Sequence, residues 1–319
     1  MADYKSIKGT KIQNYTTDPD NPLTGQVWYN ETDQVLKVST GPLVSAWATG
    51  GDLNTARQAL GGAGTQTAAI AFGGASPFQA ATELYNGSSW TEVNDLNTAR
   101  IYVTGAGTQT SALAIGGFVP PYSGVTESWD GTSWTTVSSL NTARGIVAAA
   151  GADNTAVLAF GGFIPPNTAE TESWNGTSWT EVNDLNTVRR ALGGAGNQTS
   201  ALAFGGIDLT PAFTGATESW NGTSWTEVND LNTARDALAG AGTQTAALAF
   251  GGETLSALTE SWDGTSWTEV SDLSIGRQFL AGAGANNTSA LAFGGEAPPG
   301  TAATEEWSIS GGNKTITSS

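Results

Sequence analysis

One motif recurs six times along the chain, and this repetition limits the folds that the chain can adopt. The string Asp-Leu-Asn-Thr-Ala-Arg stands at residues 52–57, 95–100 and 230–235, with a close copy at 184–189 and weaker copies ending at 144 and 277. Each copy also contains a Gly-Gly pair after an apolar run, and successive pairs begin 43 to 46 residues apart. Self-similarity at this period is the signature of a repeat architecture, in which each repeat is one supersecondary unit. The six repeat arginines are Arg57, Arg100, Arg144, Arg189, Arg235 and Arg277.

Each repeat predicts four short strands. The first is rich in Ala and Gly, the second ends at Gly-Gly, the third carries an aromatic residue and the fourth begins with Trp. Small side chains favour the first strand as the innermost one, where sheets crowd around an axis, and the large Trp residues belong further out. An Asn-Gly or Asp-Gly pair between the third and fourth strands favours a two-residue hairpin turn. Such a turn would place Trp220 opposite Thr223.

The count of aromatic residues predicts a closed ring of six sheets. The outer Trp residues are Trp47, Trp90, Trp134, Trp179, Trp225 and Trp267, and the first of them precedes the first repeat arginine. We therefore expect residues 45–50 to supply the outer strand of the last sheet, which would remove two open sheet edges. The alternative is that residues 314–317 fill this place after the Gly311-Gly312 turn. Either way the sequence predicts an all-β, six-bladed β-propeller with four-stranded antiparallel blades, over residues 43–319.

At this point the repeat resembles a known family. An arginine, two strands ending in Gly-Gly, an aromatic residue and then Trp is the pattern of the kelch repeat, and the resemblance covers residues 45–309. It implies a kelch-type β-propeller.

Residues 1–42 differ from the repeats and form a predicted N-terminal arm. They contain Lys5, Lys8, Lys11 and Lys37, which are four of the five lysines in the chain. Residues 26–30 and 34–38 predict two strands joined by a turn at 31–33. One hairpin is too small to fold stably alone, so it should dock on the propeller, on a partner or on a second copy of the chain. Exposed side chains at Trp28, Val35 and Leu36 would favour self-association into a homo-oligomer.

The arm also resembles segments near the N-termini of virion structural and tail-fibre proteins of marine bacteriophages. The matching residues are Asn21-Pro22, Gly25, Trp28-Tyr29-Asn30 and Asp33. The resemblance implies a component of a phage particle whose arm attaches it to other virion proteins.

Composition excludes several classes of function. The net charge of −17 repels nucleic-acid phosphates and anionic lipids. The chain contains no Cys and no His, so thiol nucleophiles, imidazole bases and zinc–thiolate sites are excluded. No apolar stretch is long enough to span a membrane, and residues 1–10 lack the apolar core of a signal peptide. We expect a virion protein that is made in the host cytoplasm, with no membrane insertion, no cofactor, no metal and no catalytic residue.

The repeated charged and aromatic residues have two interpretations. A glutamate before each inner aromatic residue could form a carboxylate array, and the arginines could form an anion-binding ring. The Trp residues could stack on sugar rings. The structural interpretation is that each glutamate pairs with a repeat arginine and that the Trp residues pack in the core, and the regular spacing favours it. The glutamates are Glu83, Glu127, Glu172, Glu218, Glu260 and Glu305.

The loops after the Gly-Gly pairs differ most between repeats, and they connect equivalent strands, so they should emerge on one face. Aromatic residues on loops over a rigid scaffold suit a binding face. The alternative is that these side chains only fold back onto the sheets. The candidate ligand-binding residues are Phe78, Phe118, Tyr122, Phe163 and Phe213.

Three functional hypotheses follow. The first is a non-enzymatic phage virion protein that displays the propeller as a tail-fibre, receptor-binding or decoration module, with a host surface glycan as a candidate partner. The second is a lectin-like glycan-binding propeller without a virion role. The third is a polysaccharide-degrading enzyme that uses only carboxylates.

Overall fold

The structure is built from β-strands throughout. The computed structural model describes residues 12–19, 23–75, 77–298 and 300–316, and within them it contains seven four-stranded sheets and no α-helix. No helix able to cross a membrane is therefore found in these ranges. The prediction of an all-β fold made of four-stranded sheets is confirmed, and the arrangement is consistent with a β-propeller. Residues used above that lie outside the described ranges are Lys5, Lys8, Lys11, Asn21, Pro22, Thr317 and the rest of residues 1–10.

The chain divides into two compact units. The repeat unit comprises Ala46–Ser308, and the terminal unit comprises Met1–Ser45 and Ile309–Ser319. The predicted boundary lies at residue 42, with all later residues in the propeller. The difference lies at the C-terminus, where the strand Asn313–Thr315 pairs with Val35–Ser39.

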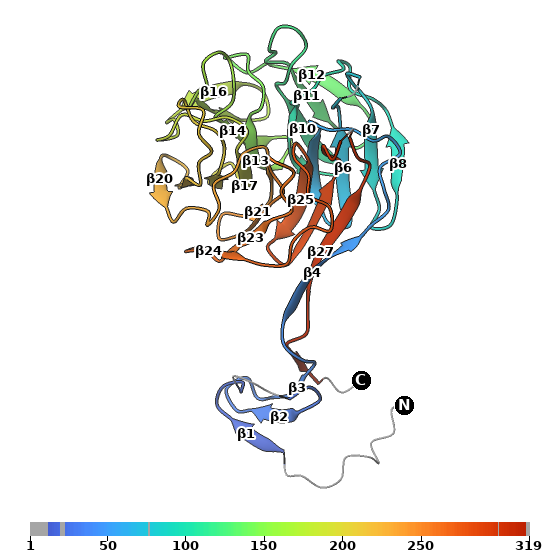
Figure 1. The fold of residues 1–319 in the computed structure, drawn as a ribbon, viewed down its shortest axis with the longest axis vertical. Helices are drawn as coiled ribbons and strands as arrows, with labels where there is room; N and C mark the ends of the chain where they lie inside the picture. The colour runs from blue at the N-terminus through green and yellow to red at the C-terminus, as the bar shows by residue number, and fades with distance from the viewer. Residues whose placement is uncertain (1–11, 20–22, 76, 299, 317–319) are drawn as a thin grey trace. The chain divides into compact units, whose positions relative to one another are not determined.

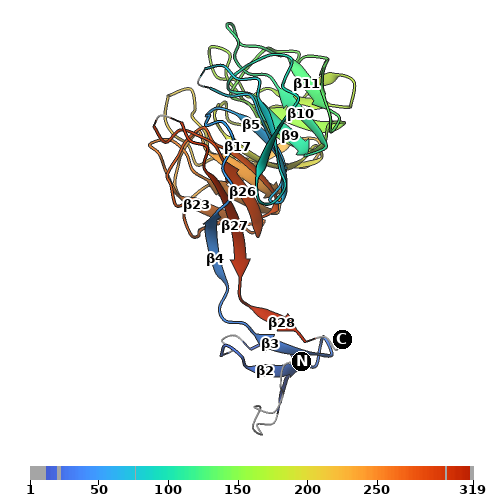
Figure 2. The same ribbon diagram turned by 90° about the vertical axis from the view of Figure 1, so that its right-hand side faces the viewer.

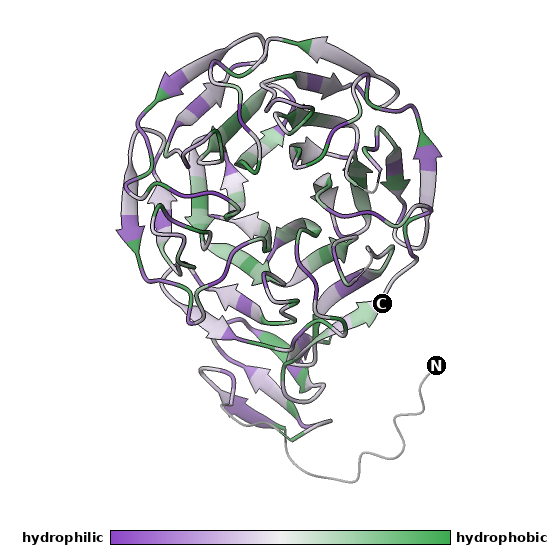
Figure 3. Ribbon diagram, turned by 45° about the horizontal axis from the view of Figure 1, so that its top comes forward, coloured by the Kyte–Doolittle hydropathy of each residue, from purple (hydrophilic) through white to green (hydrophobic). Residues whose placement is uncertain are grey.

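All six sheets of the repeat unit have the same strand order (Figure 1). Figure 3 shows them following one another around a common centre. The innermost strands contact each other in series, and the sixth contacts the first. The first strands are β5 (Gly61–Thr65), β9 (Thr104–Thr108), β13 (Ala148–Asp153), β17 (Gly193–Asn197), β21 (Ala239–Thr243) and β25 (Ala281–Asn286). The second strands are β6 (Ala68–Phe72), β10 (Ser111–Ile115), β14 (Ala156–Phe160), β18 (Ser200–Phe204), β22 (Ala246–Phe250) and β26 (Ser289–Phe293). The third strands are β7 (Thr82–Tyr85), β11 (Thr126–Trp129), β15 (Thr171–Trp174), β19 (Thr217–Trp220), β23 (Thr259–Trp262) and β27 (Thr304–Ser310). The outer strands are β8 (Trp90–Val93), β12 (Trp134–Val137), β16 (Trp179–Val182), β20 (Trp225–Val228), β24 (Trp267–Glu269) and β4 (Val44–Thr49).

Apart from their end residues, the first strands consist of Gly and Ala, because the neighbouring sheet leaves no room for larger side chains. A Cβ atom on Gly105 would lie 2.6 Å from Cζ of Phe72, which belongs to the preceding repeat. Gly240 lies equally close to Phe204 of the repeat before it. Each Phe therefore fills the space that these glycines leave empty, and this packing joins successive sheets.

The turn between the third and fourth strands differs from the prediction. Trp220 pairs directly with Trp225, so the loop holds four residues, 221–224. The predicted two-residue turn, with Trp220 opposite Thr223, was wrong. The reason is that Oδ1 of Asn221 accepts hydrogen bonds at 2.9 Å from the backbone N–H of Thr223 and of the residue after it. The side chain of Asn221 therefore closes the loop itself.

Each outer Trp joins its sheet to the preceding one. The indole N–H of Trp134 donates to Oγ1 of Thr82 at 3.0 Å, and its ring packs on Phe72 with centroids 4.9 Å apart. Trp90, in the first repeat, donates in the same way to Thr304 of the sixth repeat at 3.0 Å. The series of contacts thus returns from the last repeat to the first.

Strand β4 is the outermost strand in the sheet of the sixth repeat, whose order is β25-β26-β27-β4. Its Trp47 donates to Oγ1 of Thr259 at 3.0 Å and packs on Phe250 at 5.0 Å. These are the contacts of an outer Trp, so Trp47 serves the sixth repeat although it precedes the first one in sequence. The alternative strand near Lys314 is found in the terminal unit instead.

The terminal unit is a single four-stranded sheet. The predicted hairpin is present, and the two ends of the chain extend it on either side, with β28 beside β3 (Figure 2). The first strand runs parallel to the second. In order across the sheet the strands are β1 (Gln13–Tyr15), β2 (Val27–Asn30), β3 (Val35–Ser39) and β28 (Asn313–Thr315).

A polar network holds the terminal unit together. The carboxylate of Asp18 accepts hydrogen bonds from Trp28 Nε1 at 3.1 Å, Asn30 Nδ2 at 2.7 Å and Lys37 Nζ at 3.0 Å. Trp28 is fully buried in this unit, so the expectation that it is exposed for self-association was wrong. Its indole is instead part of the unit's own core.

Candidate ligand-binding site

A closed ring of backbone hydrogen bonds surrounds the centre of the repeat unit. It takes one residue from each repeat, always the residue two positions after the repeat arginine. The backbone N–H of each donates to the carbonyl oxygen of its counterpart in the preceding repeat at 2.8–3.3 Å, and the first repeat donates to the sixth. We call these residues the mouth ring: Ala59, Tyr102, Ile146, Ala191, Ala237 and Phe279.

All six mouth-ring residues have a φ angle between 50° and 56°. Residues with a Cβ atom rarely adopt this left-handed conformation, and a β-branched residue such as Ile146 does so at the highest cost. It persists only where the surroundings impose it, and here the hydrogen-bonded ring does so. The ring thereby holds six side chains at fixed places around the centre.

A cavity of about 140 Å³ lies at the mouth ring. It is lined by the ring residues and by the small and aliphatic residues that follow them into the inner strands. Tyr102 and Phe279 flank Ala59 in the ring, and their aromatic rings meet edge to face with centroids 5.5 Å apart. The opposite side of the ring carries the aliphatic side chains of Ile146, Ala191 and Ala237. The cavity therefore has one aromatic side and one aliphatic side.

Four of the five predicted binding residues are brought together. The ring centroids of Phe118 and Tyr122 lie 4.9 Å apart, those of Tyr122 and Phe163 lie 5.3 Å apart, and those of Phe78 and Phe118 lie 6.3 Å apart. We call these four residues the aromatic cluster. Phe213, 45% exposed, pairs through its backbone with Ile207 in its own loop, and no ring contact with the cluster is found for it among the described residues.

The aromatic cluster lies beside the mouth. Phe118 pairs through its backbone with Ile101, and Phe163 pairs with Gly145. These two partners directly precede Tyr102 and Ile146 of the mouth ring. We call the six residues in this place, one position before each ring residue, the rim: Gln58, Ile101, Gly145, Arg190, Asp236 and Gln278.

The rim changes from apolar to polar around the mouth. The first three repeats contribute the aromatic cluster, and the fourth, fifth and sixth contribute Arg190, Asp236 and Gln278. The guanidinium carbon of Arg190 lies 4.5 Å from the ring centroid of Phe163, a cation–π contact that links the two halves. Gln278 donates from Nε2 to Oε2 of Glu296 at 2.8 Å.

Asp236 is the most deeply buried charged residue of the rim, at 7% exposure. The pKa of its carboxyl group is raised to about 6, chiefly by burial and secondly by the nearby Glu253, while Arg190 acts in the opposite direction. Its backbone carbonyl accepts a hydrogen bond from the N–H of Glu253 at 2.8 Å. Perturbed carboxyl groups beside a cavity are candidates for functional groups.

The two tyrosines of the site stay protonated at neutral pH. Burial raises the pKa of both Tyr102 and Tyr122 above the usual value. Glu296 raises the pKa of Tyr102 further, while Arg190 opposes the shift at both residues. Both hydroxyl groups are thus available as hydrogen-bond donors.

The repeated arginines and glutamates form buried ion pairs, as the structural interpretation predicted. The guanidinium–carboxylate distances are 2.5–3.1 Å in five repeats, and Arg57 contacts Glu83 in the remaining one. All six arginines are at most 3% exposed. They are separated by whole sheets and do not converge on the cavity, so they stabilise the repeats and do not form an anion-binding ring.

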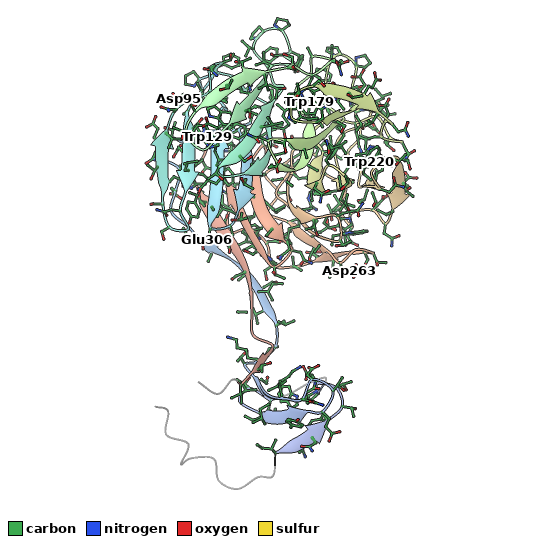
Figure 4. All side chains as sticks on the ribbon, turned by 180° about the vertical axis from the view of Figure 1, so that it is seen from behind. Asp95, Trp129, Trp179, Trp220, Asp263 and Glu306 are labelled. Atoms are coloured by element: carbon green, nitrogen blue, oxygen red, sulfur yellow. The ribbon has the colours of Figure 1, made fainter. Side chains whose placement is uncertain are left out.

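The repeat Trp residues are also used for packing. Trp129, Trp179 and Trp220, labelled in Figure 4, come from three different sheets and are at most 6% exposed. Buried indoles of this kind cannot stack on a sugar ring without unfolding their sheet.

Sequence analysis missed the mouth ring and the polar half of the rim. Tyr102, Asp236 and Phe279 stand in a short segment that was assigned to the start of an inner strand. The sequence does contain a pattern that indicates these positions. The two residues after each repeat arginine differ between repeats, while the arginine itself is constant.

No protein-family model matches the chain, and a search of curated proteins finds no match. Among the described residues, no group of three or more acidic side chains is arranged to hold a metal ion. The function of the chain must therefore be inferred from its fold and from the geometry of this site.

Proposed function

We propose that the repeat unit is a six-bladed kelch-type β-propeller that is closed by β4, and that it acts as a non-enzymatic recognition module on a bacteriophage particle. The closed hydrogen-bonded mouth ring, the contact between β25 and β5 and the bond from Trp90 to Thr304 support the closure. The arm's resemblance to virion proteins supports the placement on a particle, either as a receptor-binding tail-fibre module or as a decoration module.

The observation that carries the recognition role is the aromatic cluster beside the mouth. Partly exposed aromatic side chains with fixed positions provide large contact area at a small entropy cost. A pyranose ring has an apolar face of C–H groups and a rim of hydroxyl groups, so it matches a site that is aromatic on one side and polar on the other. Tyr122 supplies the aromatic wall, while Asp236 and Gln278 supply polar groups on the other side. A host surface glycan is therefore the ligand class that this site suits best.

The second candidate is a lectin-like propeller without a virion role. One observation favours it, namely that every residue of the site belongs to the repeat unit and none belongs to the terminal unit. The two candidates share the site and differ only in what the terminal unit does.

Binding of the labelled full-length chain to bacterial cells and to a panel of purified surface polysaccharides tests the recognition role. The test variant changes Phe118, Tyr122 and Phe163 to Ala, and the matched control changes Phe213, an exposed loop aromatic outside the cluster. We expect saturable binding that the triple variant loses and the control keeps. Equal binding by the triple variant would contradict the location, no binding to any sample would contradict the recognition role, and polysaccharide turnover would contradict the non-enzymatic assignment.

Co-sedimentation with phage particles separates the two candidates. The virion role predicts that the chain sediments with particles purified from a producing culture. It also predicts that Asp18→Ala, which breaks the polar network of the terminal unit, weakens this association without affecting glycan binding. A chain found only in the particle-free fraction would favour the lectin-like candidate.

A further inference from the structure

We propose that the mouth site selects a glycan that carries positively charged amino groups. This inference rests on the proposed glycan recognition and adds the chemical class of the ligand. The observations that lead to it are two buried acceptor atoms without donors, the charges around the cavity, and the aromatic pair in its lining.

Two acceptor atoms at the rim lack hydrogen-bond donors. Oδ1 of Asp236 and Oε1 of Gln278 are both buried, and neither has a partner in the described part of the chain. They stand in equivalent places in neighbouring repeats, directly before Ala237 and Phe279, which line the cavity. A buried acceptor without a donor is unfavourable, so native structures rarely leave one without a role. A ligand that brings donors would satisfy both atoms.

An ammonium group fits this requirement because it has three donors and no acceptor. A hydroxyl group would also bring an acceptor lone pair, and a carboxylate would bring acceptors only. Two unpaired acceptors in adjacent repeats therefore favour a primary amine in its protonated form.

The charges at the mouth point the same way. Asp236 and Glu253 lie close enough to interact electrostatically, and Glu296 interacts with Tyr102. Arg190 is the cation that acts on these groups, and it is already engaged with the ring of Phe163 and, at 3.4 Å, with Asn167. Three carboxylates against one arginine leave an excess of negative charge, on a chain with a net charge of −17. This field attracts cationic ligands and repels sulfated, phosphorylated or uronic glycans.

The aromatic pair completes the site. Tyr102 and Phe279 line the same cavity with ring centroids 5.5 Å apart. An ammonium group is attracted to the face of such rings, and the C–H groups beside it on a sugar pack against the same surface. A cation in the cavity would thus contact both π-systems, and the carboxylates around the mouth would attract it electrostatically.

The energetic state of Asp236 also supports a binding role. Its buried carboxylate stands near another acid and forms no ion pair in the described part of the chain, so ionising it at neutral pH costs stability. Residues that reduce stability are commonly kept for function. A bound ammonium would supply the missing counter-charge.

Calorimetric titration of the full-length chain with two oligosaccharides tests the inference. One is the tetramer of glucosamine and the other is the tetramer of N-acetylglucosamine, which has the same sugar backbone without the charge. At a pH that keeps the amine protonated, we expect the glucosamine tetramer to bind at least tenfold more tightly, with an affinity that falls as salt is added. Equal or tighter binding of the acetylated tetramer would overturn the inference, and so would binding of neither one. The proposed glycan recognition would survive both results if the chain still binds members of the polysaccharide panel.

A pair of charge variants tests the location. Asp236→Asn removes one negative charge at the rim, and we expect it to weaken binding of the glucosamine tetramer at least tenfold. The matched control, Asp263→Asn, removes the same charge in the same repeat at an exposed turn labelled in Figure 4. Other repeats carry Asn at that turn, as at Asn86, Asn175 and Asn221, so the control fits the fold. Unchanged binding by Asp236→Asn would overturn the proposed location.

The variant Arg190→Gln tests whether the site favours cationic or anionic ligands. A site for cations should bind the glucosamine tetramer equally well or several-fold more tightly once this arginine is neutralised. A site for anions should lose affinity. A loss of tenfold or more in Arg190→Gln would overturn the inference.

Discussion

Replacing Glu218 by Gln should destabilise the repeat unit by about 3–5 kcal/mol, the usual cost of breaking a buried ion pair by removing one partner. Glu218 is fully buried. One carboxylate oxygen accepts from Arg189 Nη2 at 3.1 Å and from the backbone N–H of Thr187 at 3.2 Å. The other accepts from the backbone N–H and the side-chain amide of Asn186 at 2.7 and 2.9 Å.

The magnitude follows from this geometry. Gln has the shape of Glu, but one of its two acceptor oxygens becomes an NH₂ donor. Whichever way the amide is oriented, that NH₂ group faces two donors that lose their acceptor, at about 1–3 kcal/mol for each buried unsatisfied group. Arg189 also loses its counter-charge at 0% exposure. These costs overlap, so we expect the combined effect to stay near about 3–5 kcal/mol.

Urea unfolding followed by Trp fluorescence measures the change, with the free energy of unfolding obtained by linear extrapolation. The matched control is Glu227→Gln, because Glu227 pairs with Glu218 on the neighbouring strand but is exposed. The control should change stability by less than about 0.5 kcal/mol. Glu127→Gln should behave like Glu218→Gln, since Glu127 contacts Arg100 and Asn97 in the same way. A loss below about 1 kcal/mol for Glu218→Gln, or an equal loss for the control, would refute the reasoning, given a total stability of about 5–15 kcal/mol.

Three further predictions concern the mouth and the last sheet. The pKa of Asp236 is raised to about 6 from a usual 3.8. The contribution of the protonated Asp236 to the free energy of unfolding is therefore fully present below pH 3.8 and is lost as the pH rises through 6. Asp236→Asn should therefore be more stable than the natural chain at pH 8, by at most about 3 kcal/mol, and equally stable below pH 3.8. Thermal unfolding at both pH values measures this difference. A stability gain that does not depend on pH would contradict the prediction. Trp47→Ala should lower stability by about 2–4 kcal/mol, because its indole packs on the fifth repeat, and an unchanged urea midpoint would contradict the place of β4 in the sixth sheet. Ala237→Gly should be at least about 1 kcal/mol less destabilising than Ala241→Gly, since only Ala237 has a positive φ, at 53°; urea unfolding of both variants decides, and equal losses would show that the mouth ring carries no strain.

The repeated interior was predictable from sequence because each contact is made by a constant residue at a constant spacing. The arginine, the glutamate and the two aromatic positions recur in register, and the ion pairs and Trp packing follow from them. The assignment of Trp47 to the last sheet came from counting alone, and the structure places it among the contacts of the fifth and sixth repeats.

Other features were not predictable because they depend on side-chain geometry or on distant pairing. Asn221 closes its loop with its own side chain, which a rule about Asn-Gly turns does not anticipate. The pairing of Lys314 with Val38 joins residues from opposite ends of the chain, and neither segment carries a repeat pattern. The positive φ of Ile146 contradicts its intrinsic preference, so no local rule places it in the mouth ring.

The functional role of the mouth is inferred from the contrast between positions that are constant and positions that vary among the repeats. The hydrogen bonds of the mouth ring use only backbone atoms, and Ala meets their requirements in three of the six repeats. Nothing in the ring itself therefore calls for Tyr at residue 102 or for Phe at residue 279, and a left-handed backbone would be easiest for Gly. At the rim, the same holds for Asp236, because another repeat has Gly145 at the equivalent position. The chain keeps large aromatic and charged side chains at places where the fold is satisfied by the smallest ones, and what they share is the cavity that they surround. A site assembled from the departures of nearly identical repeats is best explained by a ligand that contacts several repeats at once.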